Sequence, residues 1–189
     1  MGPSIAAGAF GAMTARLAAA NNPSLFAMSY DRAAARVTDL ILVPSHFFTP
    51  QIIRARKPLG PHARRAGWQG CTILIGQVPA SGRISLIRAG APAPKAQVRA
   101  AWAATRFLRD EGATARGWLL AVMGAVEAAT DAGGRPDFTL AEVYAQEARL
   151  AALYPGNHNV RPKIRQQLQV LRDRGWLAFG DKRGTYRRV

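Results

Sequence analysis

Hydrophobic residues in the second half of the chain recur at helical spacing. Over residues 116–130 they fall on one face of a predicted helix: Trp118, Leu119, Val122, Met123 and Val126. The run Gly133-Gly134-Arg135-Pro136 ends this helix. Glu142 stands three positions after Thr139, and this Thr-x-x-Glu capping box predicts that a second helix opens there and covers 140–154.

A third helix and a hairpin are predicted to follow. Ile164, Leu168 and Leu171 are spaced at i, i+4 and i+7, and Gly175 closes their helix. The pattern then changes to a strand over 176–179, a turn over 180–184 and a return strand over 185–189. Three helices followed by a basic hairpin are typical of a winged helix-turn-helix domain.

The first half has a different pattern, with short apolar runs separated by turn residues. Strands are predicted over 25–30, 39–43, 71–75 and 83–88. The first two are expected to be neighbours buried on both faces. Around them we expect a small-residue helix over 5–20, a helical turn opened by Thr49-Pro50, a basic loop over 54–68, a linker over 89–94 and a connecting helix over 95–108. The whole is a mixed α/β (α+β) fold, divided into a first domain over 1–90, a linker and connecting helix over 91–112, and a winged helix over 113–189.

The charge of the chain indicates what kind of partner it binds. The 189 residues include 26 Lys and Arg against 11 Asp and Glu, a formal charge of +15, and 49% are hydrophobic, enough for a core. From Leu40 to Arg109 there are eleven cations and no acid. Such a surface favours a polyanion, most simply nucleic acid. Because Mg²⁺-dependent phosphodiester hydrolysis needs clustered carboxylates, this stretch is expected to bind phosphate without cutting by itself.

Other function classes are excluded by what the chain lacks. Cys71 is the only cysteine and there are three histidines, too few and too scattered for a structural zinc site, so no metal is expected. No run approaches the roughly 20 apolar residues of a membrane span, and the first 20 residues do not follow a secretory signal pattern. We therefore expect a soluble, cytoplasmic, monomeric protein with no membrane partner.

The third helix of the winged domain carries the candidate base contacts. Its polar positions, with the two residues at its entrance, are Asn157, His158, Arg161, Lys163, Arg165, Gln166, Gln167, Gln169, Arg172 and Arg174. Gln can bond adenine in a bidentate manner, and Arg can bond guanine. The alternative is an ordinary solvated face, but Asp173 is the only acid from Ile164 to Gly175, so ion pairing does not explain the cations. Asn159 is expected to serve only as the N-cap.

The hairpin turn and the basic loop offer further contacts. Lys182 and Arg183 stand at the tip of the wing, followed by Arg187 and Arg188, and wings of this kind grip phosphate. The alternative is a solubilising hairpin. In the loop, Arg64 and Arg65 precede Trp68, whose indole could stack on a base or cover a methyl group. The alternative there is a core tryptophan at the start of a strand.

Several collinear motifs resemble one family along essentially the whole chain. They are Asn21-Asn22-Pro23, Lys57-Pro58-Leu59, Ala63-Arg64-Arg65-Ala66-Gly67-Trp68, Gly70-Cys71, Gln77-Val78-Pro79, Gly82-Arg83-Ile84, Lys163-Ile164-Arg165-Gln166-Gln167-Leu168-Gln169 and Leu171-Arg172-Asp173. Together they are similar to the DpnI-type restriction endonucleases, the Dam-replacing family. The resemblance implies part of a PD-(D/E)XK nuclease domain followed by a winged helix. It also implies double-stranded DNA as partner, at GATC sites that carry N6-methyladenine, in bacterial restriction-modification.

The resemblance does not decide whether this chain cuts DNA. The family's metal-binding acids, catalytic lysine and zinc-binding cysteines precede the matched motifs, and no residue of this chain matches them. Mg²⁺ is accordingly expected only for the full-length family enzyme. Three hypotheses stand: a DNA-binding relative that does not cut, an active nuclease whose sequence begins further upstream, and a winged-helix regulator with no methyl preference.

Overall fold

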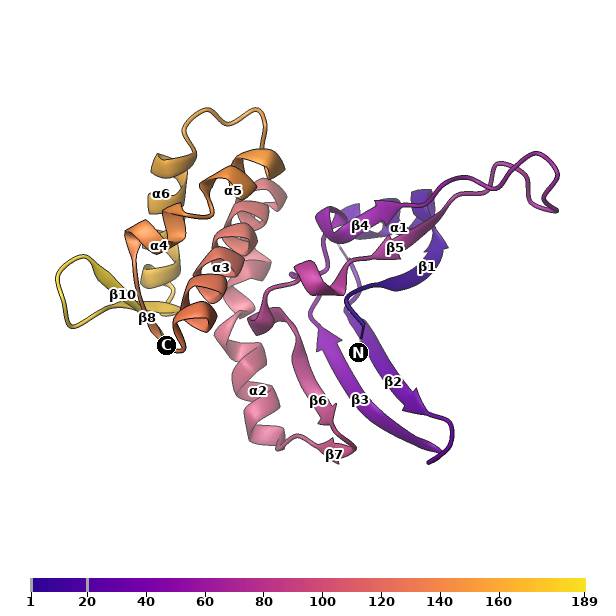
Figure 1. Ribbon diagram of the computed structural model, residues 1–189, viewed down its shortest axis with the longest axis horizontal. Coiled ribbons are helices and arrows are strands. Elements are labelled where there is room, and N and C mark those ends of the chain that lie inside the picture. Colours follow the sequence, from indigo (N-terminus) through magenta and orange to yellow (C-terminus); the bar gives the residue numbers. More distant parts are fainter. Residues whose placement is uncertain (1, 20) are drawn as a thin grey trace. The chain divides into compact units, whose positions relative to one another are not determined.

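The computed structural model describes residues 2–19 and 21–189 (Figure 1). It separates into two compact units, Met1–Ala103 and Ala104–Val189, called here the N-terminal and C-terminal units. The first is built on two antiparallel sheets, and the second is helical with a small sheet. The expected mixed α/β class is confirmed.

The first sheet of the N-terminal unit has the order β1-β5-β4, formed by β1 (Ile5–Ala9), β5 (Gly70–Ile73) and β4 (Ile53–Ala55). The prediction of one helix over 5–20 is wrong at its start, because α1 covers only Phe10–Ala18. Ile5–Ala9 instead pairs with β5, from Ile5 opposite Ile73 to Ala9 opposite Gly70. Alanine and glycine leave the local preference weak, so a pairing with a segment about 65 residues away decides the structure. Residue 20, the predicted end of the helix, lies outside the described residues.

The second sheet has the order β2-β3-β6-β7, formed by β2 (Leu25–Asp31), β3 (Arg36–Val43), β6 (Ile84–Arg88) and β7 (Ala91–Pro92). The prediction that the first two strands are buried on both faces is wrong for β2. Phe26, Met28 and Tyr30, which alternate along one face of the strand, are 61%, 62% and 53% exposed, because no element of the described chain covers that face. The predicted linker over 89–94 is also corrected, since Gly90 turns the chain at φ +80° and β7 pairs with β6.

Short turns and a helix complete this unit. The helical turn expected at Thr49-Pro50 is a 3-10 turn, Pro50–Ile52, and two more follow at Ile75–Gln77 and Ala80–Gly82. The predicted connecting helix ends earlier than 108, as α2 (Lys95–Ala104), and a 3-10 segment covers Arg106–Asp110.

The C-terminal unit has the predicted winged helix-turn-helix outline. Its helices are α3 (Ala113–Gly133), α4 (Leu140–Tyr144), α5 (Glu147–Leu153) and α6 (Val160–Asp173), and its sheet has the order β8-β10-β9, from β8 (Asp137–Thr139), β10 (Thr185–Arg188) and β9 (Leu177–Phe179). Phe138, Leu150, Ile164, Leu168 and Leu171 are fully buried, so the helical stripe read from the sequence forms the core.

The capping box is confirmed, but the helix that it opens is shorter than predicted. Thr139 Oγ1 accepts the Glu142 amide at 3.3 Å, and Glu142 Oε2 accepts the Thr139 amide at 2.7 Å. The single helix over 140–154 is wrong. The Gln146 amide bonds the Val143 carbonyl three residues back, which tightens the last turn of α4, and α5 begins afresh at Glu147.

Candidate nucleic-acid interface

Helix α6 has one buried face and one polar face. Val160, Ile164, Gln167, Leu168 and Leu171 are buried. The prediction that Gln167 belongs to the polar face is therefore wrong, because its side chain is only 4% exposed and lies among the core residues of the stripe. Arg161, Arg165, Gln166 and Gln169 are exposed, and Lys163 and Arg172 are partly so. A mostly basic and amide face without acids remains on this part of the helix.

Three cations of this face are held by neighbouring side chains. Arg161 donates to Glu147 of α5 at 2.8 Å, and its guanidinium lies 5.2 Å from the centre of the Tyr144 ring. Arg172 pairs with Asp173 at 2.8 Å and stacks on Phe179. Lys163 Nζ donates to Gln166 Oε1 at 2.8 Å. Sequence spacing does not reveal the contact from Glu147 to Arg161, since it joins two helices across a turn.

Arg165 and Gln169 differ from these residues. Among the residues that the structure describes, neither side chain forms a hydrogen bond or an ion pair. They stand four positions apart, which places them one turn from each other on the same helical face. Their polar groups are therefore available to a partner.

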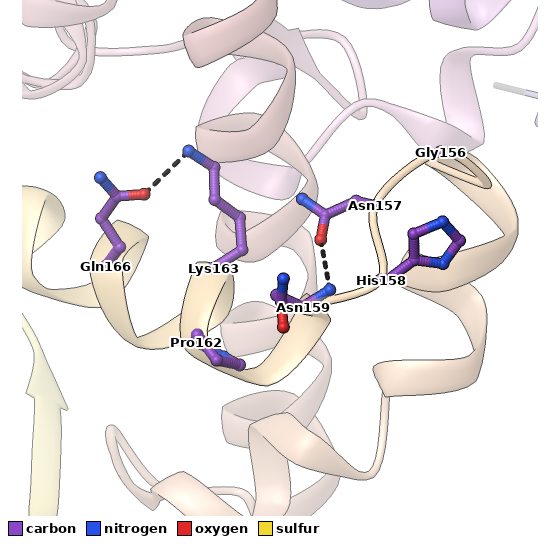
Figure 2. A pocket seen from close by; sticks show the side chains of 7 residues that line it. All are labelled: Gly156, Asn157, His158, Asn159, Pro162, Lys163 and Gln166. Atoms are coloured by element: carbon purple, nitrogen blue, oxygen red, sulfur yellow. Dashed lines mark hydrogen bonds between the residues drawn. The ribbon is translucent and has the colours of Figure 1, made fainter.

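Two shallow hollows flank the start of α6. The first, of about 550 Å³, is lined by Gly156, Asn157, His158, Asn159, Pro162, Lys163 and Gln166 (Figure 2). The second, of about 630 Å³, is lined by Tyr144, Arg161, Pro162, Arg165, Gln166 and Gln169. Pro162 and Gln166 line both, so they form the ridge between them. The structure thus brings together most of the candidate residues that the sequence placed on this helix and at its entrance.

The entrance of α6 is organised by an asparagine turn. Asn159 occupies the N-cap position, but its side chain makes no capping hydrogen bond. Instead Asn157 Oδ1 accepts the Asn159 amide at 2.8 Å, as Figure 2 shows. Asn159 is thus the N-cap residue, as expected, although Asn157 rather than Asn159 supplies the side-chain hydrogen bond at this position. The turn fixes the backbone beside His158 at the mouth of the first hollow.

The wing carries two unpaired cations at its tip and two paired cations in β10, where Arg188 lies 3.7 Å from Asp131. Lys182 and Arg183 are exposed, and neither pairs with an acid in the described part of the chain. Arg187 donates to both carboxylate oxygens of Asp137, at 2.8 and 3.2 Å, and to Asp181 at 2.7 Å. These hydrogen bonds from Arg187 hold the pKa of the Asp137 carboxyl below its usual range. Arg187 therefore fastens the wing to β8, a contact that its position in the sequence did not reveal.

Trp68 lies in the basic segment that joins β4 and β5. Its side chain is half-buried: it is neither fully enclosed in the core nor fully exposed. The indole rests against Gly70, where an added Cβ would come 2.9 Å from a ring atom. The Arg65 guanidinium lies 5.4 Å from the ring centre. Arg64 and Arg65 are exposed.

Two findings concern the described residues as a set. Over residues 2–19 and 21–189, no group of three His, Cys, Asp or Glu side chains is close enough to hold a metal ion. Within the same residues, every helix is too short or too polar to cross a membrane.

Comparison with family models gives two matches. Residues 1–111 match the model of the Dam-replacing family, DpnI, and residues 114–188 match that of the Dam-replacing HTH domain. The chain belongs to the Dam-replacing family. The predicted resemblance is confirmed over nearly the whole chain, and with it the helix-turn-helix domain at the C-terminal end. Because the chain has a Dam-replacing HTH domain, its partner is DNA. The family to which it belongs is one of restriction enzymes.

Proposed function

We propose that this chain binds double-stranded DNA sequence-specifically at GATC sites that carry N6-methyladenine, and that it does not cut DNA by itself. The observation that carries the proposal is the pair of unpartnered side chains, Arg165 and Gln169, on the exposed face of α6 in a Dam-replacing HTH domain. The proposal further includes a monomer acting in the bacterial cytoplasm.

Helix α6 is proposed to lie in the major groove with its exposed polar face toward the bases. Gln169 would bond adenine at N6 and N7, and Arg165 would bond guanine at O6 and N7, the pairings that the groove edges favour. The GATC sequence offers both bases. Asn157, His158 and Gln166 line the hollow at the entrance of the helix, where side chains of a recognition helix reach base edges.

The remaining cations are proposed to position the domain on the DNA. Arg161, Lys163 and Arg172 would face phosphates beside the groove, and their hydrogen bonds to Glu147, Gln166 and Asp173 hold them in place. Lys182 and Arg183 at the wing tip would grip the adjacent backbone. Phosphate contacts of this kind add affinity and carry no sequence information.

A second proposed contact is made by Trp68. An N6-methyl group adds apolar surface in the major groove, and an indole face can cover it. Arg64 and Arg65 would bind neighbouring phosphates. Because Arg65 now lies over the indole, a phosphate that draws Arg65 away would also uncover the ring for the methyl group.

The absence of cutting is proposed from the acids of the N-terminal unit. The carboxylates before Asp110 are Asp31 and Asp39. Asp31 accepts the amides of Ala33 and Ala34, and Asp39 accepts the Ala89 amide, so both stabilise turns. Two separate turn carboxylates do not supply the clustered ligands that Mg²⁺ hydrolysis needs. Hence no cofactor is proposed for this chain.

Binding titrations with three duplexes test the proposal: methylated GATC, unmethylated GATC and an unrelated sequence. Gln169→Ala should lower the preference for GATC by the roughly 1–3 kcal/mol of a good base contact. Lys182→Ala should weaken binding to all three duplexes alike and flatten the salt dependence. Equal effects of both changes on every duplex would refute the assigned roles.

Two further outcomes separate the alternatives. A chain that binds both GATC duplexes equally is a regulator without methyl preference, and the methyl part of the proposal fails. Site-specific cleavage of methylated plasmid by the purified chain with Mg²⁺ would refute the proposal that it does not cut.

A further inference from the structure

The second sheet of the N-terminal unit carries a pocket of about 500 Å³, which lies outside the surfaces assigned to DNA. Three isoleucines give it an apolar lining: Ile41 of β3, Ile87 of β6, and Ile75 at the start of a 3-10 turn. Strands β3 and β6 lie side by side (Figure 1). Gly76 and Pro3 also line the pocket, and the Gly76 amide donates to the Pro3 carbonyl at 2.8 Å. An apolar hollow of this size is typical of a small-molecule site.

Three charged side chains also line this pocket, namely Asp39, Arg83 and Arg88. Asp39 accepts the Ala89 amide at 3.4 Å through Oδ1, and in the described part of the chain its Oδ2 has no hydrogen-bond or ion-pair partner. Among the same residues, neither guanidinium forms a side-chain hydrogen bond or an ion pair. One carboxylate and two cations give the pocket a net positive charge, which favours an anionic ligand.

The two arginines stand at opposite ends of β6. Arg83 immediately precedes the strand and Arg88 is its last residue, a span of about 16 Å at the rise of a strand. Because Leu40 lies opposite Ile87, the next residues along the paired strands, Asp39 and Arg88, share one end of the pocket. That end offers a hydrogen-bond acceptor beside a donor, and the other end offers a single guanidinium.

A guanine nucleotide carries groups that match both ends. The Watson–Crick edge of guanine has two neighbouring N–H donors, at N1 and N2, beside the acceptor O6. The Asp39 carboxylate can accept from both donors, and the Arg88 guanidinium can donate to O6. A terminal phosphate has a charge of about −1.5 to −2 at pH 7 and forms strong charge-assisted hydrogen bonds with a guanidinium such as that of Arg83. The flat faces of the base suit the isoleucine lining.

We propose that this pocket binds a free guanine nucleoside monophosphate, with the edge of the base on Asp39 and Arg88 and the phosphate on Arg83. Adenine is rejected because its N1 is an acceptor, which would face the carboxylate with no proton between them. All the residues involved belong to the N-terminal unit and none is assigned to DNA, so the inference does not rest on the proposed function.

Calorimetric titration of the full chain without DNA tests the proposal with GMP, AMP, guanosine and inorganic phosphate. GMP should bind about 10- to 100-fold more tightly than AMP, the effect of hydrogen bonds to a charged group. It should also bind more tightly than guanosine or phosphate, because only GMP occupies both ends. The proposal is overturned if GMP does not bind, or if AMP or phosphate binds as tightly as GMP.

Asp39→Asn should exchange one nucleotide for another. The asparagine oxygen can still accept the Ala89 amide, so the turn keeps its hydrogen bond. The new amide group presents a donor to the base. GMP binding should therefore weaken about 10-fold or more, whereas xanthosine monophosphate, which has an oxygen in place of the 2-amino group, should bind more tightly than it does to the unmodified chain. A structural role of Asp39 does not produce this exchange, and an equal change for both nucleotides would overturn the base contact.

Arg83→Gln tests the phosphate end of the pocket. It should weaken GMP binding about 10-fold or more and leave guanosine binding unchanged, because only the phosphate loses its partner. Arg99→Gln is the matched control, since it removes an exposed cation of the same unit that does not line the pocket. Equal losses in the two variants would show that overall charge alone attracts the nucleotide, and the proposal would be wrong.

A competition experiment distinguishes a free nucleotide from a guanine within a DNA strand. A single-stranded oligonucleotide with an internal guanine should not displace GMP, because its phosphates are diesters with one charge each and continue into neighbouring nucleotides. If the oligonucleotide displaces GMP, the pocket is a DNA contact and the proposal fails. The titrations with GMP do not involve α6, so their outcome is independent of whether the chain recognises GATC.

Discussion

Trp68 is held between Gly70 and Arg65, and this position makes its proposed role testable. Trp68→Ala should erase most of the methyl preference that the N-terminal unit contributes, and should cost little binding to unmethylated DNA. One buried methyl group is worth about 0.8 kcal/mol, so two methyl groups of a symmetric site give roughly a tenfold preference at most. Arg65→Ala should weaken binding to methylated and unmethylated duplexes alike.

A thermal melt of the same variant provides the control. Because Trp68 is half-buried, its removal should cost less than the roughly 3–5 kcal/mol expected for truncating a core tryptophan. A large drop in Tm with an unchanged ratio between the two duplexes would show that Trp68 is structural and would refute methyl recognition.

Gly82 packs against the ring of Phe47, which leaves no room for a larger side chain at this position. A Cβ at this position would lie 2.4 Å from a ring carbon of Phe47, and Phe47 is only 1% exposed. Because the buried ring cannot move away freely, Gly82→Ala should lower the free energy of unfolding by about 1–3 kcal/mol in urea denaturation. Gly60→Ala is the matched control, since nothing lies within 4 Å of a Cβ there, and it should have little effect. Equal stability of both variants would contradict this account of the packing.

At the scale of single elements, the start of α4 couples stability to pH. The Thr139 amide and hydroxyl bond the Glu142 carboxylate, with Arg135 beside it, and they hold the pKa of Glu142 below its ordinary value of 4.5. The unfolded chain therefore takes up this proton more readily than the folded chain. The stability due to the charged carboxylate is present above pH 4.5 and is lost as pH falls through the folded-state pKa.

The urea midpoint at pH 7, 4.5 and 3 measures this effect. Glu142→Gln should reduce the fall in midpoint on acidification, because the amide still caps the helix but does not titrate. Some fall should remain, since the Asp137 carboxyl also has a lowered pKa. Glu147→Gln, at an exposed ion pair with Arg161, serves as control. An unchanged pH dependence in Glu142→Gln would contradict the coupling.

The elements also show what a sequence can reveal. The stripe of Ile164, Leu168 and Leu171 and the capping box were predicted correctly, because both depend on spacing within one helix. Strands β1 and β8 were missed, because each exists through pairing with a distant segment, β5 for one and β10 for the other. The local strand preference of a segment does not identify the distant strand with which it pairs.

In the candidate interface, too, some features follow from the sequence pattern and others depend on packing. The polar face of α6 and the wing tip follow from helical periodicity and turn residues. The burial of Gln167 and the ties from Arg187 to Asp137 and Asp181 do not, because they depend on how helices and strands pack. Helical spacing alone therefore identified Arg165 and Gln169 as candidates, and only the structure distinguished them from cations that already have partners.

At the scale of the whole molecule, the two units expose apolar side chains in different ways. In the C-terminal unit Met123, Leu168 and Leu171 are fully buried, and the exposed Leu153 and Phe179 stand singly on separate elements, α5 and β9. In the N-terminal unit the edge strand β2 exposes Phe26, Met28 and Tyr30. An exposed apolar edge strand has unpaired backbone groups and is a template for association. The units should therefore differ in local stability and in their tendency to aggregate.

Hydrogen exchange of the full chain tests this difference. Amides of α3 and α6 should exchange slowly, near the limit of global unfolding, whereas those of β2 should exchange much faster, because one side of the strand is unpaired and one face is uncovered.

Met28→Lys places a charge in the exposed row of the edge strand, and it should reduce aggregation on heating without lowering Tm, since Met28 is 62% exposed. Gln169→Lys adds the same charge on exposed α6 and should leave aggregation nearly unchanged. Slow exchange across β2, or equal aggregation of the two lysine variants, would show that this strand is not the weak edge of the molecule.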